Sequence, residues 1–148
     1  MPQPCQVGPC QVGPCQVGPC RVEVGPPRVW VVFRGEAELW WLRLLKPGFR
    51  HCFALLHDGR HWVIVDPLSP FTDVSVLDLP AAFDLPGWYQ EMGMAVAAAP
   101  VRRGLTRPAP WAPFTCVEAV KRLMGLHAPG VLTPWQLYRR LTRPALAA

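Results

Sequence analysis

The stretch 49–66, FRHCFALLHDGRHWVIVD, predicts the central part of a β-sheet. Two apolar runs, 49–56 and 61–66, flank the dipeptide Asp58-Gly59, which is a strong signal for a two-residue hairpin turn. With those two residues as the loop, His51 is expected directly opposite Asp66. Residues opposite each other in an antiparallel pair share a face, with Cβ atoms about 4.5–5.5 Å apart.

A histidine and a carboxylate placed in this way form a base and the group that orients it. The Asp66 carboxylate is expected to hold one ring nitrogen of His51 and leave the other to accept a proton from a thiol. The alternatives are a core histidine bonded to backbone and a turn aspartate before Pro67. Two rival bases are His57, expected beside the turn and exposed, and His61, expected on the opposite face from the aspartate.

The stretch 112–123, APFTCVEAVKRL, predicts a helix that begins at Cys116. Thr115 is a good N-cap, and Glu118 three residues later completes the pattern of a capping box. The sulfur of Cys116 then lies among unpaired backbone N–H groups at the positive end of the helix dipole, which favours the nucleophilic thiolate. The alternative is a buried cysteine that only fills space. Cys52 is expected to point away from the histidine that precedes it.

A histidine on one strand, a polar residue on the next and a downstream cysteine that opens a helix resemble the circularly permuted papain-like fold. This is the permuted branch of the NlpC-like cell-wall peptidases and their relatives, which include the lecithin:retinol acyltransferase-like proteins. The matching residues are 48–51, 65–66 and 114–117, and the resemblance covers roughly residues 29–141. It implies that Cys116 is the nucleophile, His51 the base and Asp66 the third catalytic residue.

The neighbourhood of the cysteine departs from the family pattern, because two prolines and two aromatic residues crowd residues 110–114. Trp111 and Phe114 are candidates for an apolar substrate wall, and Trp88, in a stretch expected to be a loop, is a further binding candidate. The same crowding also suits a sealed site in an inactive relative. The backbone N–H of Cys116 is one candidate donor to an oxyanion.

The first 27 residues are predicted to be a disordered tail, and residues 28–148 a single permuted papain-like domain. The unit Cys-Gln-Val-Gly-Pro recurs from Cys5, Cys10 and Cys15, and Cys20 begins a degraded copy. The Gly-Pro pair in each unit disfavours both helix and strand. A metal or redox tail is the alternative, but four residues between cysteines lie at the edge of zinc-ligand spacing. We therefore expect neither a metal nor an organic cofactor.

Charge is distributed unevenly along the 148 residues, whose net charge is +5. After residue 101 there are eight Lys and Arg residues and one acid, Glu118. This basic third suits either a solvated face or a surface for phosphate or nucleic acid. Because no recognition motif accompanies it, nucleic acid is not the partner we expect. We also expect no membrane span, no signal peptide and a cytoplasmic location.

The predicted architecture is α+β, an antiparallel sheet of about four strands packed against the cysteine-bearing helix. Residues 38–45 suit either strand or helix, and residues 80–83 a single helical turn. Strands are expected at 29–33, 49–56 and 61–66. A short extended piece is expected at 74–77, and 92–99 suits a buried strand, although its alanines also suit a helix. Helices are expected at 116–124, ending before Gly125, and from Thr133 onward.

These features predict a cysteine-dependent hydrolase or acyltransferase that acts on an amide or ester bond of a peptide or acyl substrate. The resemblance implies a peptide or isopeptide amide, for example in cell-wall peptide, as the first substrate to expect. One rival is an inactive relative that serves as a binding or structural module, with a protein partner and association with a phage particle left open. A second rival is a nucleic-acid-binding protein that uses the basic C-terminal third.

Overall fold

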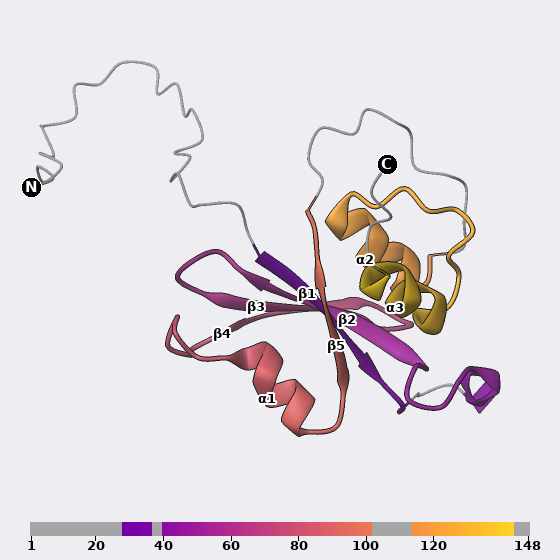
Figure 1. The fold of residues 1–148 in the computed structure, drawn as a ribbon, viewed down its shortest axis with the longest axis horizontal. Coiled ribbons are helices and arrows are strands. Elements are labelled where there is room, and N and C mark those ends of the chain that lie inside the picture. The colour runs from indigo at the N-terminus through magenta and orange to yellow at the C-terminus, as the bar shows by residue number, and fades with distance from the viewer. Residues whose placement is uncertain (1–27, 37–39, 102–113, 144–148) are drawn as a thin grey trace, which may run out of the picture.

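The computed structural model describes residues 28–36, 40–101 and 114–143, which form an α+β arrangement (Figure 1). The predicted tail of residues 1–27 and Trp111 lie outside these described residues. The α+β class is confirmed, with five strands where about four were expected. The elements in chain order are β1 (Arg28–Arg34), η1 (Trp40–Leu44), β2 (His51–His57), β3 (Trp62–Pro67), β4 (Thr72–Leu77), α1 (Leu85–Glu91), β5 (Ala95–Ala99), α2 (Cys116–Met124) and α3 (Pro134–Thr142).

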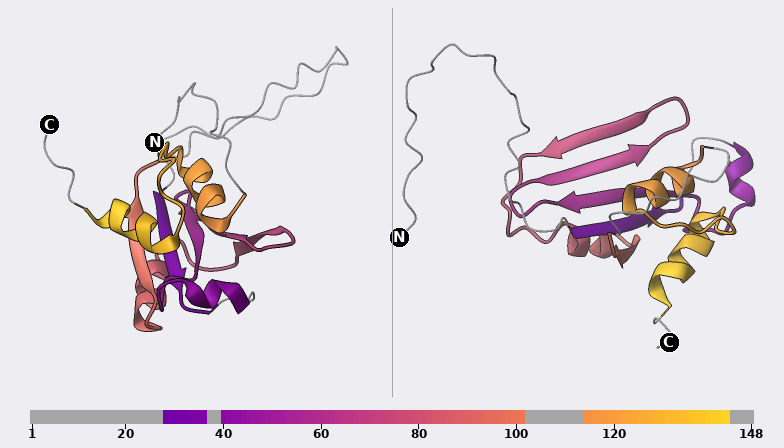
Figure 2. Two further views of the ribbon diagram at one scale, coloured as in Figure 1. Left: turned by 90° about the vertical axis from the view of Figure 1, so that its right-hand side faces the viewer. Right: turned by 90° about the horizontal axis from the view of Figure 1, so that it is seen from above.

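The five strands form one antiparallel sheet in the order β4-β3-β2-β1-β5, covered by helices on both faces (Figures 1 and 2). Alternation along β2 separates two cores. Cys52 and Ala54 belong to the core that includes buried residues of α2 and α3, whereas Phe53 and Leu55 belong to the core against α1. Both cores contribute to holding β2 in the middle of the fold.

The hairpin of β2 and β3 forms, but the prediction of a two-residue loop is wrong. The last pair joins His57 to Trp62, so the loop contains four residues. The Asp58 carboxylate explains the longer loop, because its Oδ1 accepts hydrogen bonds from the backbone N–H groups of Arg60 and His61, both at 2.7 Å. The Asp58 side chain therefore stabilises a four-residue loop in place of the tight two-residue turn.

The longer loop moves the pairing by two residues from the predicted register. Ala54 pairs with Val65, and extending this register places Phe53, not His51, opposite Asp66. Because side chains alternate with a period of two, an even shift leaves the histidine and the aspartate on the same face. The prediction that the two are direct neighbours across the strands is wrong, while their shared face is retained.

Helix α2 begins at Cys116 and ends before Gly125, as predicted from the sequence. Gly125 has φ 66°, the left-handed conformation that glycine adopts without steric cost. Val117, Val120 and Met124 lie on the buried face of this helix. Local signals at both of its ends therefore determine where the cysteine sits.

Helix α1 was not predicted, because Pro86 and Gly87 read as loop residues. Asp84 is its N-cap and accepts a hydrogen bond from the Gly87 N–H at 3.0 Å, and Pro86 lies in the first turn, where no N–H is needed. Trp88 is consequently a helical residue. In the described part of the chain, no helix has the length and apolar character needed to cross a membrane.

Candidate active site

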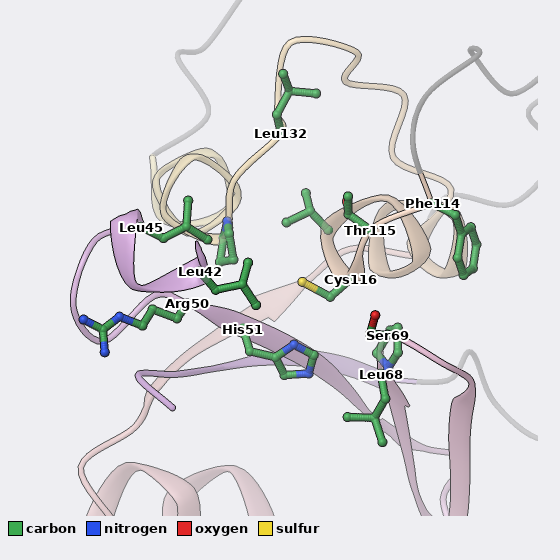
Figure 3. A pocket seen from close by; sticks show the side chains of 13 residues that line it. Leu42, Leu45, Arg50, His51, Leu68, Ser69, Phe114, Thr115, Cys116 and Leu132 are labelled. Carbon is green, nitrogen blue, oxygen red and sulfur yellow. The ribbon is translucent and has the colours of Figure 1, made fainter. Parts of the chain in front are cut away.

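The site lies where β2 and β3 stop pairing with each other. Their register ends at Ala54 and Val65, although β2 extends back to His51 along β1 and β3 extends on to Pro67 along β4. The two strands are therefore free of each other at this end of the sheet. The N-terminus of α2 brings Cys116 to this opening, above His51 (Figure 3).

His51 and Asp66 meet across the opening. Nε2 of His51 lies 2.5 Å from Oδ1 of Asp66, and both side chains are largely buried. Diagonal neighbours on adjacent strands lie within reach of long side chains, which is why the contact survives the shifted register. The bond to Nε2 leaves Nδ1 as the ring nitrogen available to the thiol.

Arg34 is a member of the site that sequence reasoning missed. It lies directly opposite His51 on β1, and its Nη2 is 3.5 Å from Oδ2 of Asp66. The carboxylate is thus held by the histidine on one oxygen and by a cation on the other. Only the β1–β2 register reveals this residue, since nothing in the local sequence of β1 distinguishes Arg34 from the other arginines of the chain.

Thr115 caps the helix that carries the cysteine, and its Oγ1 accepts a hydrogen bond from the Glu118 N–H at 3.3 Å. The predicted capping box is not formed. Glu118 is buried, and its carboxylate instead binds Lys121 at 2.8 Å and Arg122 at 2.9 Å. The start of α2 therefore has the hydrogen bond to the Thr115 side chain but lacks the reciprocal bond from the Glu118 side chain.

The surroundings of Cys116 lower the pKa of its thiol from 9.0 to about 5. The largest cause is a hydrogen bond from Cys52; burial opposes it, and the interaction with His51 adds to it. Burial by itself lowers the pKa of His51, but the bond to Asp66 and the interactions with Cys116 raise it from 6.5 to about 9. Between about pH 5 and 9 the pair therefore exists as thiolate and imidazolium.

A cavity of about 240 Å³ opens beside the sulfur (Figure 3). Its wall is mostly apolar and includes Leu42, Leu45, Leu68, Leu132, Phe114 and Val117. Arg50, Ser69 and Thr115 are the polar residues, besides the reactive pair, that the described part of the chain contributes to this wall. Ser69 lies below the start of α2 in Figure 3, and this residue too was missed from the sequence.

The other predicted residues are placed differently. Phe114 lines the cavity and is largely exposed, whereas Trp88 lies on α1 and does not line it. His57 was expected to be exposed but is buried, with its ring 4.4 Å from that of Trp62 at the far end of β2. His61 contacts Asp58 in the hairpin loop. Neither rival histidine lines the cavity.

Among the described residues, no group of three or more His, Cys, Asp or Glu side chains is arranged to hold a metal ion. Comparison of the chain with protein-family models, curated proteins and solved structures found no match. The class defined by the fold is an α+β protein with a five-stranded antiparallel sheet and a partly buried Cys-His-Asp cluster at one end of it.

Proposed function

We propose that this protein is a cysteine-dependent hydrolase or acyltransferase of the permuted papain-like type, acting on an amide or ester bond. One observation carries the proposal. A thiol at the first position of a helix contacts a histidine whose other nitrogen is held by an aspartate. This is the arrangement of nucleophile, base and orienting group that covalent acyl transfer requires.

In the proposed reaction the Cys116 thiolate attacks the carbonyl carbon of the substrate. The carbon–oxygen or carbon–nitrogen bond then breaks, and the His51 imidazolium gives its proton to the departing alcohol or amine. The product of this half-reaction is a thioester on Cys116. In the second half, His51 takes a proton from water or an acceptor amine, which attacks the thioester and regenerates the thiolate. Asp66 keeps the imidazole oriented throughout.

The negative charge that develops on the carbonyl oxygen needs hydrogen-bond donors. The backbone N–H of Cys116 is one, because it is the first N–H of α2 and has no acceptor within the helix. We propose the hydroxyl of Ser69 as a second donor, since it lines the same cavity as Cys116 and lies near the start of α2 (Figure 3). Ser69 lies in the connection between β3 and β4 and is exposed.

The cavity wall favours a substrate with an apolar acyl portion. Leucines from η1, from the β3–β4 connection and from the segment before α3 surround the space beside the sulfur. Among the described residues of the wall, Arg50 is the one that is charged besides the reactive pair. A small apolar acyl group fits this lining better than the charged side chains of cell-wall peptide. Cell-wall peptide remains a substrate proposal that rests on the resemblance alone.

The direct test is to incubate the full chain with 4-nitrophenyl butyrate and locate the acyl group by peptide mass spectrometry. We expect a thioester on Cys116 that forms much faster than adducts on the tail cysteines Cys5, Cys10, Cys15 and Cys20, which serve as ordinary thiols within the same molecule. Cys116→Ala should abolish that adduct and leave the tail adducts unchanged. Acylation of Cys116 no faster than of the tail would favour the inactive binding or structural module instead.

A further inference from the structure

Cys52 is a second thiol at the site and has no part in the reaction described above. It follows His51 on β2, and its side chain lies on the sheet face that α2 covers. It is fully buried in the core formed with Val117 and Val120, and Cys116 packs against the same core. The alternation that turns Cys52 away from the histidine side chain is what directs it toward the nucleophile.

We propose that Cys52 is a positioning residue, whose buried thiol donates a hydrogen bond to the Cys116 thiolate and holds the sulfur in place for attack. This inference rests on the proposed function, because it assumes that Cys116 is the nucleophile. Cys52 does not touch the substrate or transfer the catalytic proton. Its role is to stabilise the charge on its neighbour.

The direction of the hydrogen bond follows from the surroundings of Cys52. The hydrogen bond to Cys116 and complete burial raise the pKa of Cys52 well above the ordinary value of a thiol, so it keeps its proton. The core around it consists of apolar residues such as Val31, Phe33 and Ala54, which offer no competing side-chain acceptor. A thiol is a weak donor to neutral groups, but a hydrogen bond to an ionised acceptor is stronger.

The backbone reinforces the same contact. The peptide N–H of Cys52 also donates to the sulfur of Cys116. Cys52 lies beyond the last β2–β3 pair, so β3 does not compete for this group. Two neighbouring residues of β2 thus have separate roles: His51 transfers the proton, and Cys52 stabilises the negative charge on the Cys116 sulfur.

Loss of the donor should change two measurable properties of Cys116 in opposite directions. Without the Cys52 thiol, the midpoint for ionisation of Cys116 should rise by about one pH unit, the usual scale of a lost hydrogen bond to a charged group. The fully ionised sulfur should then react about threefold faster, because the nucleophilicity of a thiolate increases with its pKa. A purely structural disturbance predicts no such paired change.

The experiment is the pH–rate profile of iodoacetamide alkylation at Cys116, read by peptide mass spectrometry on the reduced full chain. Cys52→Ala and Cys52→Val both remove the donor, and the valine variant preserves most of the side-chain volume if the alanine variant fails to fold. Cys52→Ser retains a donor and should keep the low midpoint. Val120→Ala is the matched core truncation on α2 and should leave the profile unchanged.

The outcomes separate this inference from the proposed function. A raised midpoint in both donor-free variants, with rescue by serine, supports the role of Cys52. A wild-type-like midpoint in the donor-free variants, with a raised midpoint in His51→Ala, overturns the inference and leaves the proposed function standing. If wild-type Cys116 ionises like the tail cysteines, the proposed function fails, and the role of Cys52 fails with it.

Discussion

Helices α2 and α3 begin with the same sequence pattern, a threonine followed three residues later by glutamate or glutamine, yet their ends are built differently. At α3 the capping box is complete. Gln136 donates its N–H to Thr133 Oγ1 at 3.3 Å, and its Oε1 accepts the N–H groups of Thr133 and Leu132 at 3.0 and 2.9 Å. At α2 the threonine caps the helix, but the glutamate does not return to it.

Glu118 is recruited by a buried partner. Lys121 binds its carboxylate, and the same ammonium donates to the backbone carbonyls of Ala128 and Val131 at 2.9 and 3.0 Å. These bonds fasten the connection between the two helices, which carries Leu132 to the cavity. One helix start is thus closed by its own side chains. At the start of α2, the Glu118 carboxylate binds Lys121 and does not return to the N-cap backbone N–H, so this end of the helix faces the cavity with only the threonine cap.

The largest test of this difference is His51→Ala. If the start of α2 is the reactive one, acylation by an activated ester should fall about a thousandfold, since both thiol activation and proton transfer are lost. In wild type the rate should fall as pH decreases through about 5, where Cys116 gains its proton, and as pH increases through about 9, where His51 loses its own. A flat profile between pH 4 and 10 would contradict the ion pair.

Ser69→Ala tests whether the Ser69 hydroxyl donates a hydrogen bond to the oxyanion that forms beside the start of α2. Acylation of Cys116 should slow by about a hundredfold, the usual effect of removing one such donor. Alkylation of the same sulfur by iodoacetamide builds no oxyanion and should proceed at the wild-type rate. Equal slowing of both reactions would assign Ser69 a role in thiolate formation instead.

Exchange of glutamate and glutamine at the N3 positions of α2 and α3 tests why only one capping box forms. Glu118→Gln gives α2 the pattern of α3, but it removes the charge that Lys121 requires, and we expect a loss of about 3 kcal/mol in the free energy of unfolding. Gln136→Glu is the reciprocal change at an exposed position and should stay within about 0.5 kcal/mol of wild type. Urea denaturation of both variants measures the contrast, and equal losses would contradict it.

The smallest expected effect comes from the two N-caps. Thr115→Ala and Thr133→Ala should each cost about 1 kcal/mol of unfolding free energy, because each threonine satisfies one helix donor. Thr133→Ala should leave the alkylation rate of Cys116 unchanged, whereas Thr115→Ala should alter it. Identical alkylation profiles for the two variants would show that the cap does not influence the sulfur.

Much of the site was accessible from local sequence. The boundaries of α2, the cap at Thr115 and the C-terminal Gly125 all depend on signals within a few residues, and each was predicted correctly. The pairing of His51 with Asp66 was anticipated for an incomplete reason, because the loop was longer than expected and only the even shift preserved their shared face. Whether the fold is papain-like stays a prediction.

The sequence by itself determined the elements whose ends are set by neighbouring residues, because capping and turn signals act over three or four positions. Tertiary structure alone decided which side chains come together in the site. Arg34 reaches Asp66 through the β1–β2 register, Ser69 through a hairpin, and Cys52 through the packing of α2 on the sheet. These contacts join residues far apart in the chain, and side-chain identity does not encode the register and packing that bring them together.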